Sequence, residues 1–307
     1  MERPGDDEAS GYVIKALMGN ANPKLGKDIS EALGVRLCDC EVAKFADGEI
    51  NMQIKENIRG ADTIKLSSAK RITAVIPYYG YARQDRKTRP RVPISASAVA
   101  QLIETMGADR VVTVDLHCGQ IQGFFHHTPV DNLFAEGEFI DTLRLKYPEP
   151  ADVVIVSPDA GGVLRARRVA DKLHAENVAT ILKRRAQANV IEAMQIVGSV
   201  DGKKCVIIDD IIDTAGTLCK AAELLKENGA TDVIACATHG VFSGGAAMDR
   251  INASCLTAVY VTDSIPQEHN KARCDKLHVL SIAPLLARAI RRIHEEKSLS
   301  VLFGNTL

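Results

Sequence analysis

Two segments of this chain repeat the same pattern, LIETMGADRVVTVDLH at 102–117 and LLKENGATDVIACATH at 224–239. Each reads as the end of a helix, a glycine, a buried strand and a histidine. A glycine just past a helix is a common C-terminal cap, and the apolar run after it predicts a strand. Each copy is also preceded by the pattern of a strand, a loop and a helix. The repeat therefore predicts two similar α/β halves related by internal duplication.

Strands and helices alternate along the rest of the chain. Alternation of this kind is typical of doubly wound parallel sheets that are covered by helices. We expect an α/β fold with two such domains, an N-terminal one formed by 1–144 plus 286–307 and a C-terminal one formed by 145–285. Outside the repeat, the clearest predicted strands are 153–158 and 178–183, and the predicted helices are 23–33, 94–106, 162–174, 217–228 and 283–294.

The composition argues against nucleic-acid and membrane partners. The net charge is −1, so no overall field attracts nucleic acid or an anionic membrane. No apolar run approaches the length of a membrane span, and the acidic start lacks the features of a signal peptide. The eight cysteines are scattered without zinc-ligand spacing, which favours reduced thiols. We expect a cytoplasmic protein.

The segment VIIDDIIDTAGT, at 206–217, carries the strongest chemical signal. A buried strand leads into two carboxylates, Asp209 and Asp210, and a small, polar run then opens a helix. Backbone N–H groups at a helix start favour an anion, whereas carboxylates accept from sugar hydroxyls or bind magnesium. A phosphorylated sugar satisfies both parts, with its ribose hydroxyls on the two carboxylates. Its phosphate would lie on Asp213, Thr214, Ala215, Gly216 and Thr217.

The alternative for this segment is a helix capped by Asp or Thr. A cap explains one acidic residue but not three acidic residues followed by Thr-Ala-Gly-Thr. The arrangement resembles the phosphoribosyl-pyrophosphate loop of type I phosphoribosyltransferase folds. That resemblance implies this fold for the two domains.

Two loops of the first half carry further candidates. Residues 79–93, YGYARQDRKTRPRVP, combine aromatic, guanidinium and amide groups in the manner of a nucleotide platform, although a solvated charged loop would look similar. In 115–125, DLHCGQIQGFF, Asp115 and His117 project to the same side if the strand continues. They would then bind a metal or a nucleotide phosphate.

Two loops of the second half complete the set. In SPDAGGVLRAR, at 157–167, Asp159 is a candidate magnesium ligand or ribose contact, and a helix cap is a real competitor. Three adjacent cations, 183–185, follow the strand predicted at 178–183. They are either a surface cluster or the source of positive charge for a phosphoryl-transfer transition state.

Taken together, these motifs resemble the ribose-phosphate pyrophosphokinase family from about residue 11 to about residue 303. The motifs occur in the family's order: FADGEI (45–50), YARQDRK (81–87), DLHCGQIQGFF, PVDNL (129–133), SPDAGG, KRR, DDIIDTAGT, THGVFSG (238–244) and AIRRIHEEKSLSVLF (289–303). The resemblance implies transfer of the diphosphoryl group of ATP to the 1-hydroxyl of ribose 5-phosphate, with AMP as the other product.

The resemblance also implies roles for single residues. ATP would be contacted by Phe45, Asp47, Glu49, Arg83, Gln84 and His117. Catalysis would rest on Lys183, Arg185 and His117, with Arg185 also near ribose 5-phosphate. Magnesium would be held by His117, Asp159, Asp115 and Asp131. Members of the family need Mg²⁺, and many are regulated by phosphate or ADP and assemble as homo-oligomers, with dimers forming hexamers.

The chain departs from the family pattern at two places. TIKLSS, at 63–68, stands where the family has some two dozen residues forming a strand, a loop and most of a helix. In GFFHHTPVDNL, His126 and His127 occupy a segment where the family has one residue fewer and often an acidic residue. The acidic residue to which the family owes a metal contact is thus replaced here by histidine.

Two alternative functions remain at this point. The shortened segment fits a catalytically silent, synthetase-like regulatory subunit, although such a subunit has no need of the whole set of site residues. A phosphoribosyltransferase would use the same loop at 209–217. The nucleotide motifs of the first half argue against it.

Overall fold

The computed structural model describes residues 13–56, 71–187 and 190–303, and the side chains of residues 183–193 lie outside this description. The segment at 63–68, where the sequence predicts a missing unit, also lies outside the described residues. The chain divides into two compact units, Met1–Phe134 with Ile282–Leu307 (unit 1) and Ala135–Ser281 (unit 2).

The domain division expected from the sequence stays a prediction. Its boundaries at 144/145 and 285/286 fall inside two helices, α3 (Glu136–Lys146) and α8 (Ala283–His294). The boundaries between the two compact units instead lie just before each of these helices begins. A helix packs as one rigid element, so a boundary just before it separates fewer contacts than a boundary inside it.

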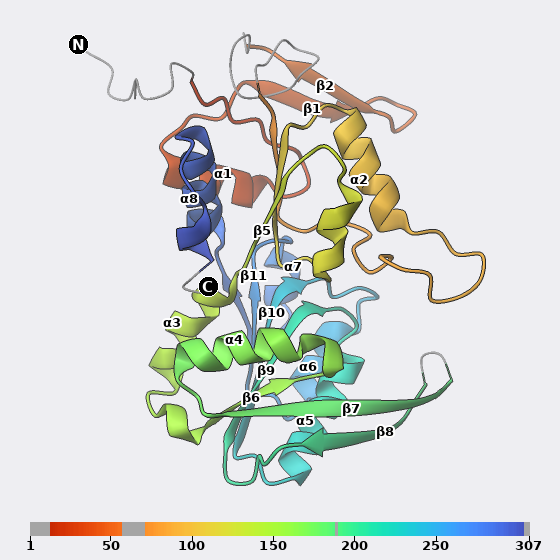
Figure 1. Ribbon diagram of the computed structural model, residues 1–307, viewed down its shortest axis with the longest axis vertical. Coiled ribbons are helices and arrows are strands. Elements are labelled where there is room, and N and C mark those ends of the chain that lie inside the picture. Colours follow the sequence, from red (N-terminus) through yellow and green to blue (C-terminus); the bar gives the residue numbers. More distant parts are fainter. Residues whose placement is uncertain (1–12, 57–70, 188–189, 304–307) are drawn as a thin grey trace. The chain divides into compact units, whose positions relative to one another are not determined.

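Unit 1 contains a small parallel sheet with the order β3-β4-β5 and a separate antiparallel pair, β1-β2. Its helices α1 and α8 lie side by side, joined where the Arg291 side chain donates to the Leu33 carbonyl at 2.5 Å. The bounds are α1 Pro23–Leu33, β1 Cys40–Lys44, β2 Ile50–Ile54, β3 Thr73–Ile76, α2 Ser95–Thr105, β4 Arg110–Val114 and β5 Val130–Leu133 (Figure 1). The helices predicted at 23–33 and 283–294 agree with α1 and α8.

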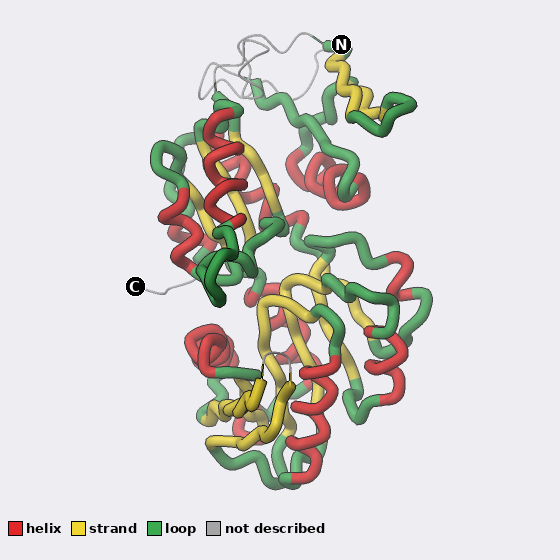
Figure 2. Tube along the Cα trace, turned by 90° about the vertical axis from the view of Figure 1, so that its right-hand side faces the viewer, coloured by secondary structure: helices red, strands yellow, loops and turns green. Residues whose placement is uncertain are grey.

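Unit 2 is built on a sheet with the order β12-β11-β10-β9-β6-β7-β8, in which only the β7-β8 pair is antiparallel. Helix α4 covers one face, and α5 and α6 lie on the other (Figures 1 and 2). The strands are β6 Val153–Ser157, β7 Asn177–Gln187, β8 Val190–Val197, β9 Lys204–Ile212, β10 Asp232–Gly240, β11 Ala258–Thr262 and β12 Leu277–Leu280. The remaining helices are α4 Val163–Leu173, α5 Gly216–Glu227, α6 Ala247–Ala253 and α7 Glu268–Lys271.

Both parts of the fold confirm an α/β protein with parallel sheets. The core of unit 2 runs along β6, β9 and β10 and under α5, with Val206, Ile234 and Leu225 fully buried. The smaller core of unit 1 packs α2 on β4 and includes Val111, Ala100 and Ile121. Across the described ranges, no helix has both the length and the apolar character needed to cross a membrane.

The strand predicted at 178–183 is longer than expected. β7 continues to Gln187 because β8 pairs with it as a hairpin, with Lys183 opposite Met194 and Arg185 opposite Ile191. The prediction that the cations 183–185 follow the strand is therefore wrong. The apolar pattern stops at Leu182, but the backbone hydrogen bonds to β8 carry the strand further.

Candidate functional site

The residues predicted to bind ribose 5-phosphate lie on β9 and at the start of α5. Asp209 and Asp210 are inside β9, which ends only at Ile212, so the strand runs through both carboxylates. Asp210 is buried, and Asp209 is partly exposed. The carboxyl end of a parallel strand is where open α/β sheets bind ligands, and these residues occupy that place in unit 2.

Helix α5 begins without a side-chain cap. Its N-cap residue is Ala215, in the left-handed conformation at φ 59° and ψ −2°, which makes no side-chain cap hydrogen bond. The alternative of an Asp or Thr cap is therefore wrong. A left-handed residue followed by helical ones turns successive N–H groups to one side, which makes a concave anion site.

The two polar residues before Ala215 are held from the segment that follows β10. The Asp213 carboxylate accepts from the backbone N–H of Ser243 at 3.2 Å and from the Ser243 hydroxyl. The Thr214 carbonyl accepts from the Arg250 guanidinium at 2.7 Å. The predicted phosphate loop thus has partners on a second segment of unit 2.

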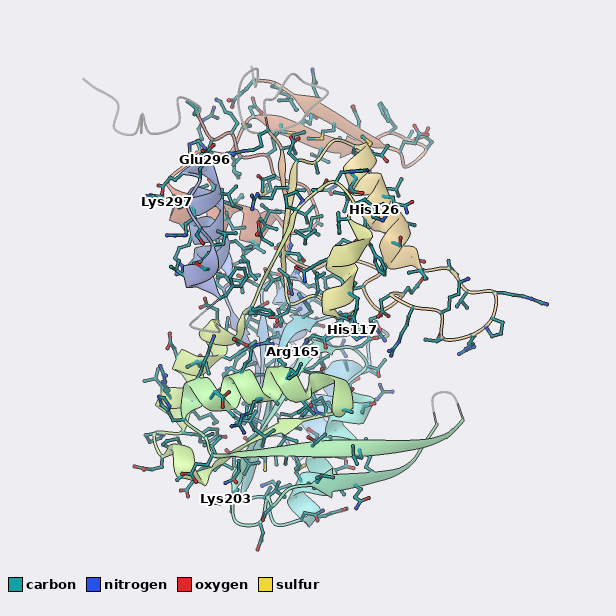
Figure 3. The ribbon with its side chains drawn as sticks, viewed as in Figure 1. His117, His126, Arg165, Lys203, Glu296 and Lys297 are labelled. Carbon is teal, nitrogen blue, oxygen red and sulfur yellow. The ribbon has the colours of Figure 1, made fainter. Side chains whose placement is uncertain are left out.

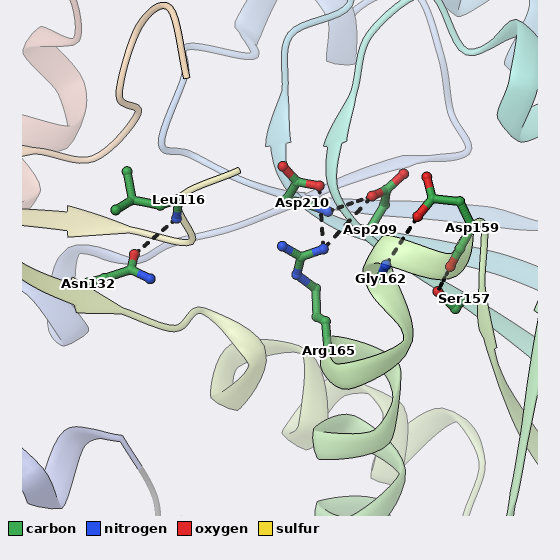
Figure 4. Close-up of polar contacts among 8 residues, drawn as sticks. All are labelled: Leu116, Asn132, Ser157, Asp159, Gly162, Arg165, Asp209 and Asp210. Atoms are coloured by element: carbon green, nitrogen blue, oxygen red, sulfur yellow. Dashed lines mark hydrogen bonds and ion pairs between the residues drawn. The ribbon is translucent and has the colours of Figure 1, made fainter. Parts of the chain in front are cut away.

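Arg165 is a site residue that the sequence reasoning missed. It lies in the first turn of α4, and its Nη1 atom is 3.4 Å from an Asp210 oxygen and 4.0 Å from an Asp209 oxygen (Figure 4). Its Nε atom is buried and has no hydrogen-bond partner among the described residues. The motif SPDAGGVLRAR contains this arginine, but nothing in the spacing indicates that it reaches across to β9.

Burial and the adjacent Asp210 carboxylate raise the pKa of Asp209, and the nearby Arg165 guanidinium opposes that rise. The Asp210 backbone N–H donates to an Asp209 oxygen at 2.9 Å and also favours the ionised form. Two carboxylates side by side are costly to ionise together. They are suited to receive hydroxyl donors or a cation from a ligand.

Asp159 lies after β6 and acts as a cap in the free protein. Its side chain accepts from the Gly162 N–H at 3.1 Å, and its carbonyl accepts from the Ser157 hydroxyl at 2.6 Å (Figure 4). The capping alternative is therefore what the structure contains. The role of the Asp159 carboxylate as a magnesium ligand or ribose contact stays a prediction.

Three residues predicted to contact ATP, Phe45, Asp47 and Glu49, lie in the turn of the β1-β2 hairpin. Phe45 is half exposed, and its N–H donates to the Glu49 carbonyl at 2.8 Å. Asp47 accepts from the Glu49 N–H at 3.0 Å and so stabilises the turn around Gly48. Their side chains are exposed, so they are available to a ligand.

The loops 79–93 and 115–125 lie together in unit 1. The Cys118 thiol donates to the Asp85 carboxylate at 3.1 Å, and the buried Tyr79 ring meets the Phe125 ring edge-on. Burial and the Asp85 contact raise the pKa of Cys118 to about 11. Arg83 and Gln84 are exposed on the first loop, and Gln84 accepts from the Ser95 hydroxyl at 2.5 Å.

The predicted placement of Asp115 and His117 on one continuing strand is wrong. β4 ends at Val114, and Asp115 has a positive φ of 43°, so the chain turns there. Asp115 is buried, whereas His117 is exposed on the following loop (Figure 3). The strand stops because its neighbours β3 and β5 pair with it only as far as Ile76 and Leu133.

The predicted magnesium ligands of unit 1, Asp115, His117 and Asp131, do not form a preformed metal cluster among the described residues. No group of three or more His, Cys, Asp or Glu side chains suited to a metal occurs within 13–56, 71–187 and 190–303. Asp131 is paired with Arg110 at 2.6 Å, which favours a structural role. Magnesium typically uses one or two carboxylates together with substrate phosphates and water, so sparse carboxylates fit a metal that arrives with a nucleotide.

Comparisons with known proteins show which family the chain resembles. Residues 14–66 and 61–107 match the family model of the N-terminal domain of ribose phosphate pyrophosphokinase, and residues 175–304 match the phosphoribosyl synthetase-associated domain. The chain is 48% identical over 315 residues to a ribose-phosphate pyrophosphokinase of Haemophilus influenzae, with 95% of this chain and 99% of that protein covered.

The chain belongs to the ribose-phosphate pyrophosphokinase family. A ribose-phosphate pyrophosphokinase of Caldanaerobacter subterraneus is 49% identical, with 94% of this chain and 98% of that protein covered. The crystal structure of a phosphoribosylpyrophosphate synthetase from Mycobacterium smegmatis superposes with a TM-score of 0.86 at 41% identity. The superposition covers 92% of this chain and 99% of the Mycobacterium smegmatis chain.

The same comparisons bear on the shortened segment of the first half. The alignment with the Haemophilus influenzae protein is 315 residues long, whereas this chain has 307, so the alignment includes residues that this chain lacks. The match to the N-terminal domain is split between 14–66 and 61–107, at the segment where the sequence predicts a missing strand and helix. The absence of this unit from the fold stays a prediction.

Proposed function

We propose that this chain is a ribose-phosphate diphosphokinase. The oxygen of the 1-hydroxyl of ribose 5-phosphate attacks the β-phosphorus of ATP, the bond between the α- and β-phosphates breaks, and AMP leaves as the hydroxyl loses its proton. The observation that carries the proposal is the junction of β9 and α5. Two adjacent carboxylates lie just before an uncapped helix start with a left-handed Ala215.

This junction suits a ribose phosphate because, within a few residues, it offers acceptors for hydroxyl groups and donors for a phosphate. Asp209 and Asp210 accept from the ribose 2- and 3-hydroxyls, and the N–H groups and hydroxyls of 213–217 donate to the 5-phosphate. A ligand that is only an anion would offer the carboxylates no hydroxyl donor. A ligand that is only a sugar would leave the helix start unused.

The diphosphoryl group would meet positive charge from Lys183 and Arg185. In-line phosphoryl transfer depends on positioning and charge rather than on a protein base. Magnesium, with His117 and Asp159 as its contacts and Asp115 and Asp131 as further candidates, would supply additional charge neutralisation on the phosphates. Adenine would lie against the hairpin turn, and the ATP phosphates near Arg83 and Gln84.

A second copy of the chain is the proposed partner, with dimers assembling to a hexamer. Support comes from the exposed apolar side chains on the β1-β2 hairpin, namely Phe45, Ile50 and Met52. An apolar group of this kind on a two-stranded hairpin is best covered by another protein surface. We also propose that the chain acts in the cytoplasm and responds to phosphate or ADP, as the family resemblance implies.

The decisive assay is AMP formation from ATP and magnesium by the purified chain, with and without ribose 5-phosphate. Sugar-dependent AMP release supports the proposal. A second candidate, the catalytically silent regulatory subunit, is favoured by the shorter first half. A folded chain that binds ATP but releases no AMP would establish that candidate and overturn the activity.

Asp209→Ala tests the ribose assignment. We expect the KM for ribose 5-phosphate to rise about tenfold or more, because the hydrogen bonds that the ribose hydroxyls donate to the Asp209 carboxyl group are lost. The KM for ATP should stay within about twofold of its normal value, since the loss is confined to the sugar. The matched control is Asp171→Ala, which removes an exposed carboxylate of α4 in the same unit. An unchanged KM for ribose 5-phosphate would overturn the assignment.

A further inference from the structure

The predicted phosphate loop of unit 2, residues 213–217, is held in place by hydrogen bonds from a segment outside the loop. After β10, the N–H groups of Val241 and Phe242 donate to the Ile212 carbonyl at 2.9 and 3.2 Å. Ser243 holds Asp213, and Arg250 on α6 holds the Thr214 carbonyl at 2.7 Å. Each residue from Ile212 to Thr214 therefore has a partner on the segment 241–250.

The next residue of the chain, Ala215, has a strained backbone conformation. Ala215 has a positive φ of 59°, a region that residues with a Cβ atom occupy only at a cost in free energy. Rotating the Thr214–Ala215 peptide by half a turn would carry φ of Ala215 into the ordinary negative range. The chain would relieve the strain by this rotation unless something held the peptide in place.

The same rotation would damage the anion site. A trans peptide is planar, so its C=O and N–H point in opposite directions. With the Thr214 carbonyl turned to Arg250, the Ala215 N–H points away from Arg250. The Ala215 carbonyl accepts from Cys219 along the helix, which leaves the Gly216 N–H directed out of the helix start. A rotated peptide would replace one of these N–H donors with a carbonyl oxygen that repels a phosphate.

We propose that Arg250 is a positioning residue that holds the Thr214–Ala215 peptide in the orientation that receives the phosphate of ribose 5-phosphate. The Arg250 guanidinium lies outside the phosphate loop, and its hydrogen bond prevents the peptide rotation that would relieve the strain at Ala215. The inference rests on the proposed function, because that function supplies the phosphate. It adds a residue on α6 and a peptide rotation that the function itself does not require.

The test compares Arg250→Ala, Arg250→Lys, and the double variant Arg250→Ala with Ala215→Gly. In Arg250→Ala, one charge-assisted hydrogen bond is lost and the peptide can rotate to relieve the strain at Ala215. We expect the KM for ribose 5-phosphate to rise about tenfold in this variant. The KM for ATP and the turnover at saturating ribose 5-phosphate should stay within about twofold. Lysine keeps a donor and should recover part of the loss.

The double variant separates peptide rotation from general damage. Glycine occupies the left-handed region freely, so Ala215→Gly should lower the raised KM of Arg250→Ala towards normal. A structural defect of α6 would not be repaired in this way. The matched control is Asn252→Ala on the same helix, whose amide donates to the Arg273 carbonyl and not to the phosphate loop.

Calorimetric titration of ribose 5-phosphate without ATP gives a readout that does not depend on turnover. We expect the affinities to fall in the order wild type, Arg250→Lys, Arg250→Ala, with recovery in the double variant. Equal affinities for Arg250→Ala and Asn252→Ala, or no recovery with glycine, would overturn the inference. A wild type that binds the sugar phosphate but releases no AMP overturns the proposed activity alone, whereas one that does not bind it overturns both.

Discussion

In unit 1 strand β4 stops at Val114, whereas in unit 2 the corresponding strand β10 continues to Gly240. The helices that precede them end in the same way. Gly107 and Gly229 have φ values of 87° and 90°, and each begins a Schellman motif, with Ala108 bonded to Ile103 and Ala230 to Leu225. The two repeats thus share their helix ends and differ in their strand ends.

The difference comes from the neighbouring strands. β4 is flanked by β3 and β5, each with four residues, whereas β10 pairs with β9 along its whole length. As a result His117 falls on an exposed loop, and His239 is buried inside β10 with its Nδ1 atom 2.9 Å from the Ser264 hydroxyl. Equivalent histidines of the repeat therefore lie in different environments, one exposed and one buried.

The largest expected effect is on His117. We expect His117→Ala to lower turnover about a hundredfold, because a polar contact to the reacting phosphates or their metal is lost. The free energy of unfolding should be nearly unchanged, since surface substitutions have small effects on stability. Steady-state AMP formation and urea unfolding measure the two quantities. A large loss of stability would contradict the contrast with His239.

His239→Ala should show the opposite behaviour. We expect the free energy of unfolding to fall by about 1–3 kcal/mol, because a buried partner of Ser264 is removed. Turnover per folded molecule should change by less than about threefold, since His239 has no role in the proposed chemistry. Ser264→Ala and the double variant complete a cycle that isolates the contact. Independent, additive losses would show that the pair is not coupled.

The smallest expected effect concerns Asp209, which β9 carries into the sheet. The pKa of Asp209 is raised in the folded protein. At pH values between the ordinary carboxyl pKa and this raised pKa, the folded state therefore keeps a proton that the unfolded state has released. The free energy of unfolding should therefore decrease as pH rises through that window. Asp209→Asn should remove this part of the dependence.

Urea unfolding of both proteins between pH 4 and pH 9, without ligand, measures the difference, and these limits are set to bracket roughly the raised and ordinary carboxyl values. The stabilities of the two proteins should diverge as pH rises, with the asparagine variant becoming relatively more stable. Parallel curves would mean that Asp209 ionises normally.

Much of the site could be predicted from local sequence. The run of acidic and small residues at 209–217 predicts a phosphate loop that leads from a strand into a helix, and β9 and α5 lie on either side of that run. The FADGE motif likewise matches the hairpin turn. Arg165 and Arg250 could not be found in this way, since they contact residues 45 and 36 positions away in the chain.

The sequence by itself determined the α/β class, the family, the helix ends at the two glycines and the strand-to-helix junction near residue 216, because these depend on short-range backbone preferences and on motif order. Only the tertiary structure decided where β4, β7 and β10 end, which histidine is buried and which arginines support the loop. A strand continues as long as a neighbour offers hydrogen bonds, and neighbours are chosen by the packing of the whole sheet rather than by the residues of the strand itself.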